Sequence, residues 1–268
     1  MAMREILSLI KASFHTALSY RLSMVLSLGS LLFTVVPLFF VARALQPTMA
    51  KSISTEGGVY FAFLLVGMIA YTYISVSVNA IPSVVSSGVA TGTLEALLAT
   101  RAPLPSLLLG LIGYNFLWTT VRAVVLLIAG MLFGVHLAWG QLGSSLLILA
   151  LIVLSYLPFG LIGAALMLAF RTTGPLASVV LILSGLLGGV YYPTSVIPAG
   201  IQQLSAAVPL TYGLRALRRT LLEGVPFSAV APDVITLVGF VVLLTSVGLL
   251  ALAEALHYAR RAGTLAQY

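Results

Sequence analysis

The sequence predicts an all-α polytopic membrane protein with six transmembrane helices. Of its 268 residues, 60% are hydrophobic and only 7% are charged, whereas soluble domains carry about 25% charged residues. The mean hydropathy is +1.15. Charged residues are absent from six intervals, and each has room for the roughly 20 apolar residues that cross a bilayer. These intervals are 22–42, 57–94, 102–121, 123–170, 172–214 and 234–253.

One transmembrane domain is expected over residues 1–268. In chain order it comprises an N-terminal interface helix (1–21), spans 1 and 2 (22–82), a coupling-helix loop (83–105), spans 3 to 5 (106–192), re-entrant or outer helices (193–232), and span 6 with a cytoplasmic tail (233–268). The spans themselves are expected at about 22–42, 59–81, 106–135, 142–170, 174–192 and 234–252.

Two of these segments are predicted from residue patterns. Residues 2–20 place Arg4, Lys11 and His15 on one helical stripe and apolar residues on another, which is typical of a helix lying in the membrane interface. The stretch 193–232 contains apolar pieces that are too short to cross the membrane and are separated by prolines. Its helical part is expected to present Leu210, Leu214, Leu217 and Leu221 on a face opposite Arg215, Arg218 and Arg219.

Six spans place both termini on one side of the membrane. Seven basic residues fall on that side and five on the other, so the positive-inside rule puts the termini in the cytoplasm. We expect a multi-pass protein of the cell (plasma) membrane.

Composition and motifs exclude several functions. The only lysines are Lys11 and Lys51, and neither lies in the Gly-Lys-Ser/Thr motif of an ATP-hydrolysing P-loop. All six acidic residues fall at predicted surfaces or loops, which argues against coupling to ions through an intramembrane carboxylate. With no cysteine and three isolated histidines, we expect no metal site, no catalytic residues and no cofactor in this chain. The basic residues are too scattered for a nucleic-acid-binding face.

A short polar-edged segment, residues 92–101, lies between spans 2 and 3. Thr93 is a suitable N-cap, and Glu95 in the first turn complements the helix dipole. A brief helix held between two spans at a membrane surface suits contact with a partner protein better than catalysis. The alternative is an ordinary solvated loop helix.

Arg122 is the one charge deep within a predicted span, where it is costly unless it is paired or reaches water. It is a candidate for a pathway for an anionic or amphipathic substrate, with Tyr71, Tyr73 and Asn79 of span 2 as further candidates. The alternative, which the sequence favours, is that Arg122 snorkels to an interface and the span 2 residues make ordinary hydrogen bonds between helices.

Three stretches in a fixed order resemble the membrane subunit of an ABC-2 type exporter. They are GTLEALL at 92–98, GVYYPTSVIP at 189–198 and VPLTYGLRALR at 208–218. The six-span layout and the N-terminal interface helix are similar to that family as well, so the resemblance covers essentially the whole chain.

The resemblance implies roles for two sets of residues. The coupling helix that contacts a separate ATP-binding subunit would include Gly92, Thr93, Leu94, Glu95, Leu98 and Arg101. The outer re-entrant gate would include Pro193, Pro198, Pro209, Thr211, Tyr212, Arg215 and Arg218.

The resemblance also implies partners and an activity. Two copies of the ATP-binding subunit, which carries MgATP, would serve two permease chains paired as a homo- or heterodimer among membrane lipids. Spans 2 and 5 would line a route for an amphipathic small molecule or lipid, moved by alternating access. The alternatives are a membrane assembly or scaffold protein without transport activity and, less favoured, an ion-coupled secondary transporter.

Overall fold

The computed structural model describes residues 21–90, 104–170 and 175–261, and these form only helices and loops. Five described helices are long and apolar enough to cross a membrane. They are α2 (Arg21–Met49), α3 (Tyr60–Ala90), α5 (Leu104–Leu132), α6 (Leu142–Phe170) and α10 (Phe227–Arg261). The predicted interface helix, residues 1–21, lies almost wholly outside the described residues, as does the whole of the 92–101 segment.

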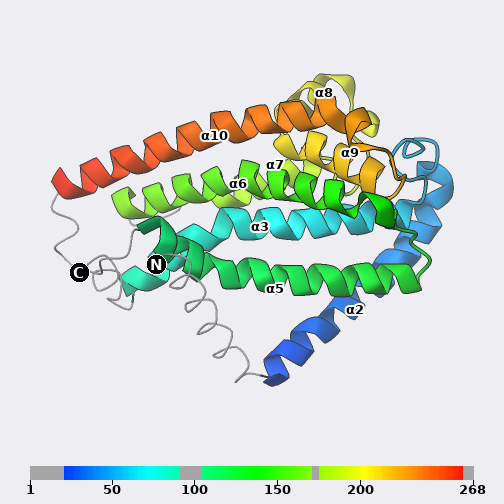
Figure 1. Cartoon of the computed structure of the whole chain (residues 1–268), viewed down its shortest axis with the longest axis horizontal. Helices are drawn as coiled ribbons and strands as arrows, with labels where there is room; N and C mark the ends of the chain where they lie inside the picture. The colour runs from blue at the N-terminus through cyan, green and yellow to red at the C-terminus, as the bar shows by residue number, and fades with distance from the viewer. Residues whose placement is uncertain (1–20, 91–103, 171–174, 262–268) are drawn as a thin grey trace.

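Shorter elements complete the bundle. They are the 3-10 turns η1 (Trp139–Gln141) and η2 (Thr194–Val196) and the helices α7 (Leu176–Leu187), α8 (Ala199–Ser205) and α9 (Pro209–Leu221). Figure 1 shows α8 and α9 gathered at one end of the bundle, beside the connection between α2 and α3.

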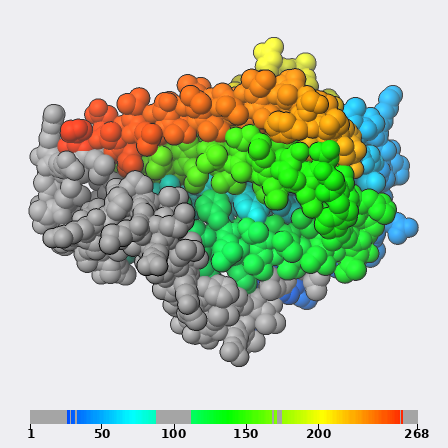
Figure 2. All heavy atoms as spheres, in the orientation of Figure 1, coloured from blue at the N-terminus to red at the C-terminus, as the bar shows by residue number. Residues whose placement is uncertain are grey.

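The α3 helix is the centre of the bundle. Within its most apolar part 72% of the residues are buried, against 17 to 39% for the other four long helices. It contacts α2, α5, α6, α7 and α9, and in Figure 1 it lies between α6 and α5. Along the outer side, α10 packs on α6 over most of its length, as Figure 2 also shows. The largely apolar sequence of α3, which contains no charged residue, suits this central position.

Glycines in α6 allow its close approach to α3. A Cβ atom at Gly160 would lie 2.7 Å from the backbone oxygen of Ser77, and one at Gly163 would lie 2.8 Å from the ring of Pro82. Small residues permit this close backbone contact between membrane helices, where van der Waals packing is the main attraction.

The fifth predicted span, 174–192, differs from the helix in the structure. The α7 helix covers only Leu176–Leu187 and ends as Gly189 adopts a φ of +79°. Twelve residues give a length of about 18 Å, which is short of the roughly 30 Å hydrocarbon core. The expectation of one continuous span over 174–192 is therefore wrong.

Prolines do not end helices where the sequence suggested. The α3 helix continues through Pro82 to Ala90, past the expected end at 81, and α10 begins at Phe227 with Pro232 inside it, so the outer helical region ends before 232. Likewise α2 reaches Met49 rather than 42. A proline removes one backbone hydrogen bond, and helix packing compensates for this loss.

Substituting Gly160 tests the α3–α6 contact. We expect Gly160→Ala to lower the apparent melting temperature of the purified protein, because the new methyl group meets the Ser77 carbonyl and overpacking costs about 1–3 kcal/mol. Gly143→Ala on the same helix has nothing within 4 Å of the added Cβ and serves as the control. Equal melting temperatures for the two variants would contradict the close packing.

Candidate functional site

The α9 helix carries a buried arginine. Pro209 occupies the first turn, where its missing N–H costs no hydrogen bond, and Leu210, Leu214, Leu217 and Leu221 are buried as expected. Arg218, however, is only 1% exposed. The expectation that Arg218 lies opposite the leucines is wrong, because Arg218 follows Leu214 by four residues and shares its face.

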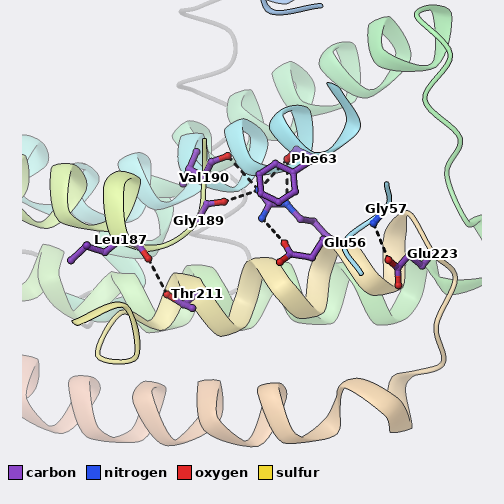
Figure 3. Close-up of polar contacts among 9 residues, drawn as sticks. Glu56, Gly57, Phe63, Leu187, Gly189, Val190, Thr211 and Glu223 are labelled. Carbon is purple, nitrogen blue, oxygen red and sulfur yellow. Dashed lines mark hydrogen bonds and ion pairs between the residues drawn. The ribbon is translucent and has the colours of Figure 1, made fainter. Parts of the chain in front are cut away.

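The guanidinium of Arg218 is surrounded by partners from distant segments (Figure 3). Its Nη1 donates to Oε2 of Glu56 at 2.9 Å, and its Nε donates to the Phe63 carbonyl at 3.2 Å. Nη2 donates to the carbonyls of Phe63 at 3.1 Å, Gly189 at 2.9 Å and Val190 at 3.3 Å. The guanidinium carbon also lies 3.3 Å from the centre of the Phe63 ring. We call Glu56, Phe63, Gly189, Val190 and Arg218 the outer lock.

Two glycines make this arrangement sterically possible. A Cβ at Gly67 would lie 2.8 Å from Nη2 of Arg218 and 2.5 Å from the Val190 oxygen, so only a glycine leaves room for both groups. Gly189 adopts the left-handed conformation that glycine tolerates best. The site therefore depends on residues without side chains as well as on charged ones.

Burial and pairing act in opposite directions on Arg218. Desolvation lowers the pKa of Arg218 to about 10, and the neighbouring Glu56 carboxylate partly offsets that fall. The side chain therefore stays protonated at neutral pH. A buried charge is costly unless its hydrogen bonds are satisfied, and here the carboxylate and three carbonyls supply the acceptors.

Further hydrogen bonds support the outer lock. The Tyr60 hydroxyl donates to the carbonyl of Tyr191 at 2.8 Å, and the backbone N–H of Gly57 donates to Oε1 of Glu223 at 2.8 Å. Together with the lock itself, these contacts join the start of α3 and the loop before it to the segment after α7 and to the end of α9.

Apart from Arg215 and Arg218, the predicted gate residues lie in the segment between α7 and α9 and in the first turn of α9. Pro193 and Pro198 are the extended residues before η2 and α8, and Pro209 starts α9. The hydroxyl of Thr211 donates to the Ser205 carbonyl at 2.7 Å, and that of Tyr212 to the Ala206 carbonyl at 3.1 Å.

Arg215 has a different environment from Arg218. It forms an ion pair with Asp233 of α10, with a nitrogen–oxygen distance of 3.5 Å and a side chain that is 43% exposed. It also lies over the Tyr212 ring, 5.6 Å from its centre. Exposed pairs contribute little to stability, so Arg218 is the arginine that holds this end of the bundle together.

A second candidate site is a hollow between α3 and α5. It has a volume of about 320 Å³, and Trp118 forms part of its wall. Its polar lining residues are Ser75, Asn79, Ser83, Asn115, Thr119 and Arg122. Two of the predicted pathway residues, Asn79 and Arg122, thus meet in one hollow.

The other two predicted pathway residues do not line this hollow. The Tyr73 hydroxyl donates to the side chain of Thr120 at 2.9 Å, which is a hydrogen bond between α3 and α5. The Tyr71 ring is half-buried near the ring of Tyr191, with the ring centres 6.4 Å apart.

Sequence reasoning does not find Glu56, Phe63, Gly189 or Val190 as a site. Glu56 is 162 residues from Arg218 in the chain, and no local pattern pairs them. The four-residue spacing of Leu214 and Arg218 is the one signal of Arg218 burial that the sequence contains. The predicted coupling residues at 92–101 lie outside the described residues.

Removing either charge of the lock should destabilise the protein. Glu56→Gln leaves Arg218 as an uncompensated buried charge, for which we expect a loss of about 3 kcal/mol or more. Arg218→Gln should also lower the apparent melting temperature by several degrees, since three carbonyls lose donors. The control is Arg219→Gln on the half-buried neighbouring residue, and a drop as large as that of Arg218→Gln would refute the special role of Arg218.

Comparison with models of protein families identifies a relationship that covers most of the chain. A family model described as ABC-2 type transporter matches residues 2–222. That range contains the outer lock, the hollow and the 92–101 segment. A comparison with curated proteins found no match.

Proposed function

Because the chain belongs to the ABC-2 type transporter family, we propose that it is the membrane-spanning subunit of an exporter driven by ATP that a separate subunit hydrolyses. Membership of this family and the long apolar helices make the chain a multi-pass transport permease. The export direction, the ATP-binding partner with its MgATP, and the pairing of two permease chains are parts of the proposal.

The observation that carries the proposal is the position of α3. Its first residues, Tyr60 and Phe63, take part in the outer lock and its supporting contacts. Its last described residue, Ala90, leads directly to the 92–101 segment. At 31 residues the helix is about 46 Å long, and it is the most buried of the long helices. A rigid element thus connects the segment proposed to contact the ATPase with the lock at the other end.

This connection supports a mechanism of alternating access. Binding of ATP would close the paired ATP-binding subunits and displace the 92–101 segments of two permease chains. The displacement would be carried along α3 and α5 to the opposite end of the bundle. There the segment 188–224 would separate from the start of α3, and the Glu56–Arg218 pair would open.

The proposed topology follows from the same layout. The α7 helix and the segment 188–224 would together make the fifth passage, with α8 and α9 as the outer helices, so that the chain makes six passages. Both termini and the 92–101 segment would then face the cytoplasm of a cell whose plasma membrane holds the protein. The proposed cargo is an amphipathic small molecule or lipid.

The first test is to purify the tagged chain from its native membrane in mild detergent. We expect a P-loop ATPase to co-purify in equal amount, as identified by mass spectrometry, together with magnesium-dependent ATP hydrolysis. Recovery of the chain alone, or with partners that hydrolyse no ATP, would favour a scaffold protein instead.

A charge reversal tests the proposed coupling segment. Glu95→Arg should reduce the amount of co-purified ATPase severalfold, because it replaces an anionic contact with a cationic one, while the chain stays folded in the membrane. Glu254→Arg changes an exposed glutamate near the end of α10 and is the matched control. An unchanged ATPase yield in Glu95→Arg would count against the coupling role.

A further inference from the structure

We propose that the hollow between α3 and α5 binds an oxyanion group, phosphate or carboxylate, of an amphipathic molecule, with Arg122 as its charged partner. That this molecule is also the exported cargo rests on the proposed function.

Arg122 lies deep within a helix that is long and apolar enough to cross the membrane. It lies in α5, 18 residues after the first residue, Leu104, and ten before the last, Leu132, so at least about 15 Å of helix separates it from either end. A charged side chain near the middle of a span is costly unless a charge, a carbonyl or water compensates it.

Nothing in the described part of the chain compensates this charge. The Nε atom of Arg122 is buried without a hydrogen-bond partner. Both ion pairs found among the described residues belong to other arginines, Arg215 and Arg218. A cavity of about 20 Å³ adjoins Arg122 on its apolar side and has room for a water molecule, but a water would leave the positive charge unneutralised.

The hollow that Arg122 lines is polar but contains no acidic side chain. Its other polar groups are amides and hydroxyls. The positive charge of Arg122 selects an anion, and the amides of Asn79 and Asn115 can supply further N–H donors to it. The Asn79 amide uses one N–H on the Ser75 carbonyl, so its second N–H is available to a ligand.

The size and polarity of the hollow suit the headgroup of an amphiphile. A volume of about 320 Å³ is at the lower end of the range of about 300–1,000 Å³ for small-molecule sites, which suits a headgroup rather than a whole lipid. Val76, Ala80 and Trp118 give the same hollow an apolar portion. An amphiphile can therefore place its charged group on Arg122 and its first methylene groups against these side chains.

The natural fluorescence of the protein can report this binding. The chain has two tryptophans. Trp118 lines the hollow, whereas Trp139 lies in η1 and is 63% exposed. In a Trp139→Phe background, Trp118 becomes the only tryptophan. The full chain is placed in phosphatidylcholine nanodiscs and titrated with 2-bromododecyl phosphate, whose bromine lies next to the headgroup and quenches a nearby indole, and in parallel with the trimethylammonium analogue of the same brominated tail.

We expect saturable quenching by the phosphate probe and only weak, non-saturable quenching by the cationic one. Arg122→Gln should raise the dissociation constant of the phosphate probe about tenfold or more, as expected for loss of a charged hydrogen bond. Asn115→Ala, which keeps the arginine, should raise it less. Arg43→Gln removes an exposed arginine of α2 and should leave the constant unchanged.

Two results would overturn the inference. One is equal quenching by the phosphate and trimethylammonium probes. The other is an unchanged dissociation constant for the Arg122→Gln variant, provided that this variant elutes like the parent protein in size-exclusion chromatography. Asn115→Ala provides an independent check, since an unaltered constant in this variant as well would show that the probe binds elsewhere.

Adding phosphatidylglycerol to the nanodiscs identifies the source of the anionic group. Competition that depends on Arg122 would assign the hollow to a membrane lipid headgroup, and absence of competition would assign it to a free amphiphile. The outcome is separable from the proposed function. If an ATPase co-purifies with the chain but the chain shows no selectivity for the anionic probe, only the proposed binding site is refuted. If the chain binds the anionic probe selectively but no ATPase co-purifies, only the proposed exporter function is refuted.

Discussion

The buried charge of Arg218 is the constraint on which one end of this bundle depends. Removing a guanidinium from water is expensive, and the cost is recovered only if nearly every donor finds an acceptor. Here the acceptors come from Glu56 before α3, from Phe63 within α3, and from Gly189 and Val190 after α7. Because these segments are far apart in sequence, satisfying one side chain fixes three parts of the chain relative to one another.

The shortness of α7 follows from the same constraint. If the helix had continued from 174 to 192, the carbonyls of Gly189 and Val190 would point along its axis, toward the N–H groups of later turns. Ending at Leu187, with Gly189 in a left-handed conformation, turns both carbonyls toward Arg218. Hydropathy alone predicts a membrane passage in this region, but it contains no information about which backbone groups a distant arginine requires.

Local patterns were a reliable guide to where helices exist and a poor one to where they end and what they contact. The intervals without charge predicted the five long helices, and the observed limits of α5 and α6 lie within three residues of those expected. The helix ends expected near Pro82 and Pro232 were wrong, because packing offsets the free-energy cost of a proline within a helix. The Pro82 ring, for example, lies against Gly163 of α6. Arg218 pairs with Glu56, and Asn79 lies near Arg122, across long distances in the sequence. Periodic patterns in a single sequence do not predict such contacts.

Arg218 and Arg122 show two solutions to the same electrostatic problem. Arg218 is neutralised within the chain, so its charge serves to hold segments together. Arg122 is not neutralised by any described residue, and in our proposal an anionic group that enters the hollow offsets the free-energy cost of burying it. Along α3, Asn79 of the hollow lies sixteen residues, or about 24 Å, beyond Phe63 of the lock. The proposed anion site therefore lies toward the Ala90 end of α3, and the outer lock lies at its other end. In a permease, this arrangement allows an anion to be bound near one end of α3 while the outer lock keeps the other end closed.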